Sequence, residues 1–533
     1  MVKNKDNVVI GDLGVVKEKG VSYFYERRPW PVSESEFRKF SDDIKSLYLD
    51  SVKNCNNERL TDIALIEMVF VTQLVNIFHF NYAKEYCIEK DLYFDVSKES
   101  ESLLNPDWKA IGKMWRINIF PHGRLVRLIR RIVKGYSFNR HLSILTIVRK
   151  IFSNDKVVSV GSYDRIKREY VEHNNIFCDH YDWPDLVNKA KKKGALNKKG
   201  GYSKNDFKEL VENKIINPFL AEIIIKHKKF SKGIDLYSLK EAWIMQFTDA
   251  YELYCNLKLI KKPKTLLVTE VAKPFSKILT LSFQKSGCEV LNFSHGNDAG
   301  LLRQKWAHHA LISHCDKYVF ETSEICNRFK KSGNDRKIEK QNKTEYSNVN
   351  SSYYLTIRQL KVNNHNSDKK RVMLMGYPMN LYRDLDEGYM FFDYKFRLEV
   401  YLAKTLHAFG HTVVYKAHPD RLKEISGLMD DFVHEIIADP FEKVWRKAEV
   451  LIFTYVSTTT FCYALNLPIP IVLVEVEGST PWYNDMKELV EKRVAIVSAK
   501  IDSDVDLSNN EFIKAIDVAK DRVDLNIARQ ITG

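Results

Sequence analysis

Residues 411–420 read HTVVYKAHPD and residues 450–460 read VLIFTYVSTTT, and these two stretches decide the fold. Each begins with an apolar run typical of a buried parallel strand and ends in polar side chains. In an open α/β sheet, ligands gather where the strands end. His418 follows the first run, and the hydroxyls of Ser457 to Thr460 follow the second, where a helix is expected to begin. The pattern predicts a phosphate pocket with His418 facing it.

Further groups follow the same predicted sheet. Gly376 and Tyr377 close a strand that begins at Arg371, and a glycine there lets the backbone approach a ligand. Lys416 adds a positive charge beside His418. Plainer interpretations are an ordinary strand-to-loop turn for Gly376, a surface lysine for Lys416 and a helix N-cap for the hydroxyls. The predicted phosphate-site residues are Gly376, Tyr377, Lys416, His418, Ser457, Thr458 and Thr459.

Two upstream predicted strands also end in reactive side chains. Residues 265–270 end in Glu270, and residues 289–293 lead into a glycine-flanked loop that holds His295 and Asp298. A carboxylate or histidine held there can take a proton from a substrate hydroxyl. We therefore predict Glu270, Asp298 and His295 as catalytic candidates. Glu270 also has a structural interpretation, as a cap for the helix that follows it.

The order of predicted elements divides the chain into five segments. It predicts an α/β protein in which two Rossmann-like domains face a cleft, with a helical N-terminal extension and a C-terminal helix that crosses back. The segments are residues 1–150 (mainly helical), 151–335 (first Rossmann-like domain), 336–369 (linker), 370–505 (second Rossmann-like domain) and 506–533 (C-terminal helix).

The composition is that of a globular protein with excess positive charge. In 533 residues, 83 Lys and Arg stand against 69 Asp and Glu, giving a formal charge of +14 that favours an anionic partner. The 8 cysteines include no C-x-x-C pair, so neither a disulfide framework nor a zinc site is expected. His308, His309 and His314 lack the ligand spacing of a metal site.

The apolar segment at residues 63–80 is the nearest approach to a membrane span. It carries Glu67, Gln73 and Asn76, so we expect a buried amphipathic helix instead. The N-terminus lacks the apolar core of a signal peptide. The expected location is cytoplasmic, with peripheral contact on the inner face of the plasma membrane as an open possibility.

Taken together, these motifs resemble those of bacterial transferases that use CMP-activated acidic sugars. The Lys-Ala-His-Pro and Ser-Thr-Thr-Thr motifs are similar to the His-Pro and Ser/Ser-Thr motifs of polysialyltransferases and of capsule and lipopolysaccharide Kdo transferases. His295-Gly296 resembles the His-Gly turn of their acceptor domain. The resemblance covers roughly residues 265–474 and implies a GT-B-like glycosyltransferase, with residues 151–335 on the acceptor side and 370–505 binding the donor.

The resemblance implies roles for particular residues. His418, Pro419, Ser457 and Thr458 would bind the CMP phosphate of a nucleotide-sugar donor. The acceptor would be a lipopolysaccharide or capsule glycan, in some cases lipid-linked, and neither a cofactor, a metal nor a nucleic acid is expected. The catalytic Asp/Glu-Asp/Glu-Gly triplet of the family does not occur in the first domain, and residues 386–388, which read DEG, lie in the second.

Two other functions stay open at this point. Teichoic-acid enzymes of the CDP-glycerol polyol phosphotransferase type also place a histidine and a serine cluster at such strand ends. A protein that binds nucleic acid or membrane would suit the net charge and the basic helix face at residues 124–134. That face also fits the solvated side of an ordinary helix.

Overall fold

The computed structural model describes most of the chain. The described residues are 7–98, 106–108, 133, 139–143, 156–161, 164–181, 183–196, 204–269, 274–295, 300–303, 312, 314–332, 344–361, 369–376, 392–418, 422–501 and 504–533. The basic face at residues 124–134 lies almost wholly outside them.

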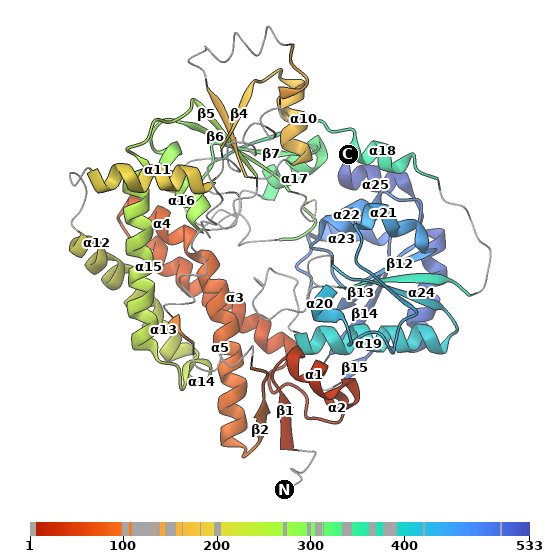
Figure 1. The fold of residues 1–533 in the computed structure, drawn as a ribbon. Helices are drawn as coiled ribbons and strands as arrows, with labels where there is room; N and C mark the ends of the chain where they lie inside the picture. The colour runs from red at the N-terminus through yellow and green to blue at the C-terminus, as the bar shows by residue number, and fades with distance from the viewer. Residues whose placement is uncertain are drawn as a thin grey trace.

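A six-stranded parallel sheet forms the centre of the first lobe (Figure 1), in the order β4-β3-β5-β6-β7-β8. We use "first lobe" for this sheet and its helices. The strands are β3 (Val157–Val160), β4 (Cys178–Tyr181), β5 (Thr265–Thr269), β6 (Glu289–Phe293), β7 (Lys317–Phe320) and β8 (Glu345–Asn348). The helices are α10 (Arg165–His173), α11 (Trp183–Leu196), α12 (Lys204–Val211), the π-helix η2 (Glu212–Ile216), α13 (Asn217–Lys226), α14 (Lys228–Ser231), α15 (Leu236–Leu257), α16 (Pro274–Gln284) and α17 (Ser323–Ser332).

The second lobe is built on a seven-stranded sheet in the order β11-β10-β9-β12-β13-β14-β15, parallel except for β15. Its strands are β9 (Arg371–Met375), β10 (Thr412–Lys416), β11 (Glu435–Ile437), β12 (Val450–Phe453), β13 (Ile471–Val476), β14 (Ala495–Ile501) and β15 (Val505–Asp506). Its helices are α19 (Phe392–Ala408), α20 (Leu422–Ile425), α21 (Phe441–Val444), the 3-10 helix η6 (Trp445–Lys447), α22 (Thr459–Leu465), α23 (Asn484–Glu491), α24 (Asn509–Asp521) and α25 (Leu525–Thr532).

Both sheets confirm the α/β class predicted from the sequence. Strands β9, β12 and β13 are buried along their apolar runs, as expected for strands covered on both faces. The predicted linker contributes to the first lobe, because β8 pairs with β7 and extends the first sheet by one strand. The short helix α18 (Tyr353–Arg358) follows β8 and leads toward the second lobe.

The N-terminal segment packs against both lobes. It contains β1 (Val8–Ile10) paired with β2 (Tyr93–Asp95), and the helices α1 (Leu13–Lys19), α2 (Val21–Tyr25), α3 (Glu34–Lys53), α4 (Glu58–Ile66) and α5 (Met68–Glu89). Helix α4 contacts α15 and α16 of the first lobe, whereas Phe24 packs edge-on against Phe396 of α19. Buried apolar side chains from all three parts form one continuous cluster.

The sequence predicted one buried helix at residues 63–80, but the structure divides this apolar segment between two helices. These are α4 and α5, which bend by 49° at Glu67. Glu67 is buried and accepts a hydrogen bond from Gln246, and burial raises its pKa to about 8. The residues of α5 from Met68 to Phe80 are mostly buried inside the protein.

Among the described residues, no single helix is long and apolar enough to cross a membrane, although α4 and α5 pass that test as a bent pair.

The chain does not end in one helix from residue 510 to 529. Arg522 ends α24, and Asp524 then accepts hydrogen bonds from the backbone N–H groups of Asn526 and Ile527 to begin α25. Helix α25 contacts α17 of the first lobe as well as α22 and α23 of the second. Arg328 of α17 donates to the carbonyl of Gln530 at 2.9 Å, which ties the last helix to the first lobe.

Candidate active site

The centre of the second sheet is a topological switch point. From β9 the chain moves to β10 and β11 on one side, and then returns to the other side of β9 to form β12 and β13. In doubly wound sheets, ligands commonly bind at such a switch point, beyond the carboxyl ends of the strands. Gly376 follows β9, His418 follows β10 and Ser457 follows β12, so the fold brings three predicted residues to this edge.

His418 and Ser457 lie beyond the ends of the two strands that flank β9. Strands β10 and β12 flank β9, so their ends are separated by two strand spacings, about 10 Å. His418 is partly exposed just beyond β10, and Ser457 is partly exposed just beyond β12. Side chains of this length can converge on one anion above the end of β9.

The hydroxyl run has mixed roles. Thr458 is the N-cap of α22, and its Oγ1 accepts a hydrogen bond from the N–H of Thr460 at 3.2 Å. The capping interpretation is thus right for Thr458, whose hydroxyl is already engaged. Ser457 precedes the cap and is partly exposed, and Thr459 is exposed in the first turn of α22. Their role as ligand hydroxyls stays a prediction.

Lys416 is not the surface lysine that one interpretation suggested. Its side chain is buried at the end of β10, and its ammonium donates to the carbonyl of Ala417. Burial lowers the pKa of Lys416 to about 8, although the carboxylates of Glu442 and Asp439 act in the opposite direction. A desolvated ammonium at a strand end gains stabilisation when an anion binds beside it.

Gly376 has a packing role that the sequence did not reveal. A Cβ at this position would lie 2.1 Å from Cζ and from the hydroxyl oxygen of Tyr415. The absence of a side chain makes room for that buried ring, whose hydroxyl donates to Glu399 at 2.6 Å. The requirement for glycine therefore comes from core packing at the site.

Gly376→Ala is expected to destabilise the protein by about 1–3 kcal/mol, because a buried ring must move to admit the methyl group. The loss should be smaller when Tyr415→Leu has already removed the ring. Urea unfolding of the wild type, both single variants and the double variant measures this coupling. Equal losses in the two backgrounds would contradict the packing explanation.

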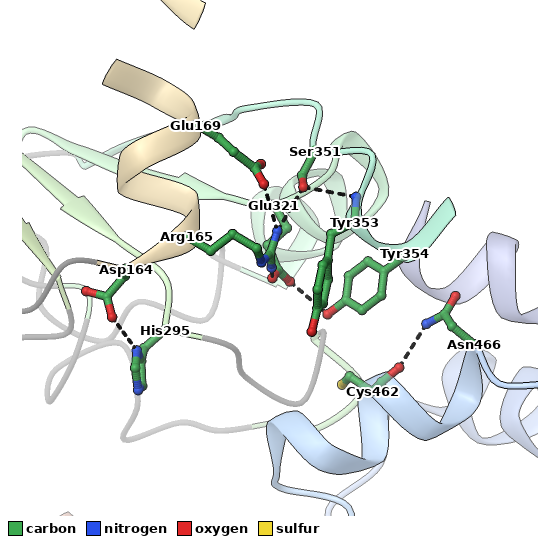
Figure 2. A network of polar contacts seen from close by, with 10 residues as sticks. All are labelled: Asp164, Arg165, Glu169, His295, Glu321, Ser351, Tyr353, Tyr354, Cys462 and Asn466. Carbon is green, nitrogen blue, oxygen red and sulfur yellow. Dashed lines mark hydrogen bonds and ion pairs between the residues drawn. The ribbon is translucent and has the colours of Figure 1, made fainter. Parts of the chain in front are cut away.

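At the carboxyl edge of the first sheet, the structure pairs His295 with Asp164 (Figure 2). Nδ1 of His295 lies 3.0 Å from Oδ1 of Asp164, and the side chains are 58% and 10% exposed. Asp164 holds the N-cap position of α10, but its side chain makes no capping hydrogen bond. A carboxylate that receives the Nδ1 proton leaves Nε2 as the basic nitrogen, which is the arrangement of a general base.

Asp164 was missed by the sequence analysis. It lies 131 residues before His295, and β5 separates β3 from β6 in the sheet. The available signal was an aspartate placed between a predicted strand with a glycine turn and an amphipathic helix. That signal also describes an ordinary N-cap, so only the folded sheet identifies its partner.

The carboxyl-end loops of the two sheets meet. Leu302, beyond the β6 loop, forms an antiparallel bridge with Trp482, beyond β13. On either side, the N–H of Arg303 donates to Pro481 at 2.7 Å and the N–H of Tyr483 donates to Leu301 at 3.1 Å. Residues 301–303, which come after β6 in the chain, therefore contact the second lobe.

A chain of aromatic and charged contacts also joins the lobes beside this edge. Arg165, next to Asp164, pairs with Glu321 and lies 3.6 Å from the ring centroid of Tyr353 on α18. Tyr353 in turn contacts Tyr463 of α22, with ring centroids 6.0 Å apart. Figure 2 shows Arg165, Glu321 and Tyr353 between the Asp164–His295 pair and α22, the helix that follows the hydroxyl run.

Four predicted site residues, Glu270, Asp298, Tyr377 and Pro419, lie outside the described residues. Within the part of the chain that the structure describes, no group of three or more His, Cys, Asp or Glu side chains is placed to hold a metal ion. A cavity of about 560 Å³ lies on another face, between α3 and the α13–α14 segment. Its walls include none of the predicted site residues.

Comparisons with known proteins gave solved structures of low similarity, among them two glycosyltransferases. No protein-family model matches the chain, and no curated protein matches it. A glycosyltransferase from Rickettsia africae ESF-5 is 12% identical, with a TM-score of 0.32 over 71% of this chain and 91% of that one. The glycosyltransferase VinC, in complex with DTDP, is 11% identical, with a TM-score of 0.30 over 71% and 94%. Similarity at this level leaves the function to be argued from the site itself.

Proposed function

We propose that this protein is a glycosyltransferase that moves a 2-keto acid sugar, such as Kdo, sialic acid or a related nonulosonate, from its CMP donor to a lipopolysaccharide or capsule glycan. The observation that carries the proposal is the position of His418 and Ser457 beyond strand ends at the switch point of the second sheet, together with the His295–Asp164 pair at the carboxyl edge of the first sheet. One lobe offers anion-binding groups and the other offers a base.

The chemistry follows from these groups. As the bond between the anomeric carbon and the phosphate oxygen breaks, negative charge grows on CMP. The ammonium of Lys416 and the imidazole of His418 stabilise that charge. His295, oriented by Asp164, takes the proton of the acceptor hydroxyl while the new bond from oxygen to the anomeric carbon forms. No step in this scheme requires a metal, so we propose that EDTA leaves the rate unchanged.

Release of CMP from candidate donors tests the proposal. We expect the purified protein to release CMP from CMP-Kdo or CMP-sialic acid, faster when a glycan acceptor is present, and to leave UDP-glucose intact. Turnover of CDP-glycerol instead would identify a polyol phosphotransferase. If none of these donors binds or reacts, the transferase proposal is wrong.

Donor affinity should depend on pH in a defined direction. Lys416 and Lys395 of α19 both have pKa values lowered to about 8 by burial. An anionic donor favours the protonated ammonium, so affinity is high below pH 8 and falls as the pH rises through it, by at most about tenfold per unit for each proton. Lys416→Met should bind CMP more weakly at pH 7 and lose part of this dependence.

Calorimetric titration with CMP at pH 7, 8 and 9 measures the effect. Lys447→Met is a suitable control, since Lys447 is exposed and pairs with Glu435. Glu435 is the first residue of β11, so this pair lies at the edge of the sheet opposite the strand ends that carry the predicted site. An affinity that stays constant from pH 7 to 9 would exclude a role for these lysines.

A further inference from the structure

A buried ion pair lies against Thr454 and Tyr455, in the loop that leads to Ser457, whose hydroxyl is predicted to bind the donor phosphate. Nζ of Lys395 is 3.4 Å from Oε1 of Glu399, one turn later on α19, and the two side chains are 2% and 0% exposed. The same ammonium donates to Oγ1 of Thr454 at 2.5 Å and lies 4.2 Å from the ring centroid of Tyr455. Thr454 directly follows β12, three residues before Ser457.

This pair connects the three strand ends of the switch point. The hydroxyl of Tyr415, near the end of β10, donates a hydrogen bond to Oε2 of Glu399. The other carboxylate oxygen, Oε1, is the one that pairs with Lys395. The ring of Tyr415 occupies the space kept open by Gly376 after β9. Contacts from one lysine and one glutamate therefore reach the ends of β9, β10 and β12, where the proposed donor phosphate binds.

Stability alone gives a poor reason for such a pair. Removing two charges from water costs several kcal/mol for each ion, and well-packed apolar residues of similar volume are often neutral or stabilising in their place. Burial also disfavours the charged form of Lys395, whose pKa falls to about 8 despite Glu399. The contacts of Lys395 with Thr454 and Tyr455 give the pair a second role, because they hold the residues that lead from β12 to Ser457.

We propose that Lys395 is a positioning residue of the donor site, which holds the Thr454–Tyr455 loop in its binding conformation and supplies positive charge behind the donor phosphate. The inference rests on the proposed function, because it presupposes an anionic donor at this edge. Lys395 acts by holding this loop and through the electric field of its ammonium group, and it does not contact the reacting atoms.

The same helix provides a matched control. Arg397 and Asp393 form a second buried i, i+4 pair on α19, with Nε and Oδ2 at 2.8 Å and side chains 4% and 3% exposed. Arg397 lies over the ring of Phe24 in the N-terminal segment, at 4.3 Å. Its contacts therefore lead away from the donor loop, while burial and pair geometry are similar.

The test measures CMP affinity by calorimetry and melting temperature for four variants. Lys395→Met should weaken CMP binding about tenfold, and Lys395→Arg should restore most of it because the positive charge returns. Arg397→Met should lower the melting temperature and leave CMP affinity near that of the wild type. The double variant Lys395→Met with Glu399→Leu removes both charges, so we expect it to stay folded yet still bind CMP weakly.

The outcomes distinguish a failure of the inference about Lys395 from a failure of the proposed function. If the wild type binds CMP and the double variant binds it equally well, the inference about Lys395 is wrong while the proposed function stands. Failure of the arginine variant to recover affinity in a folded protein would also contradict the role of charge. If the wild type binds no CMP, the proposed function fails, and this inference fails with it.

Discussion

His295→Ala is expected to lower kcat by about 10²–10⁴-fold, the usual contribution of a general base. The imidazole pairs with Asp164 at 3.0 Å and is more than half exposed at the carboxyl edge of the first sheet. Its removal leaves the acceptor hydroxyl without a group to take its proton. Donor affinity should change little, because the proposed phosphate contacts come from the other sheet.

Steady-state rates with a CMP-sugar donor and calorimetric CMP titration separate these two effects. Asp164→Asn keeps the imidazole but loses the carboxylate that fixes its tautomer, so we expect a smaller loss of kcat in the same direction. His173→Ala, which changes an exposed histidine on α10, serves as the control. If His295→Ala keeps the kcat of the wild type, the base is another group, and Glu270 and Asp298 become the candidates.

His418→Ala should produce the second large effect, a loss of about 10²–10³-fold in kcat together with weaker CMP binding. Removing one preorganised donor to a developing negative charge has consequences of this size. His418 is partly exposed beyond the end of β10, so its removal should leave the fold intact. The two histidine variants are then distinguished by CMP affinity, which falls only in His418→Ala.

His407→Ala provides the comparison within the same lobe. His407 is exposed in the last turn of α19, toward the opposite edge of the sheet, and should tolerate the change without loss of activity. Circular dichroism and melting temperature confirm that each variant is folded before its rates are compared. Near-normal turnover by a folded His418→Ala enzyme would exclude the phosphate role and with it the predicted pocket.

Much of the fold was accessible from the sequence because buried parallel strands have a strong local signature. Strand β6 has the bounds predicted from the apolar run at residues 289–293, and β5 ends at Thr269, one residue before the predicted end at Glu270. The break at Glu67 was not predicted, because a buried carboxylate held by Gln246 is a tertiary contact. Strand β8 was missed because its sequence is polar and its partner strand supplies the pairing.

The candidate site, like the fold, was predicted from the sequence only in part. The sequence determined which polar side chains follow which strands, since a strand of apolar residues ends wherever the polar residues begin. That information identified His418, Ser457, Lys416 and His295 as residues at strand ends.

Only the tertiary structure decided which strand ends are neighbours. The order of strands in a sheet depends on how helices pack across it, and no local pattern encodes that order. The tertiary structure placed β9 between β10 and β12, paired His295 with Asp164 and brought Lys395 into contact with Thr454. These relations join residues 59 to 131 positions apart, and the physical reason is that burial of apolar surface fixes them without regard to distance along the chain.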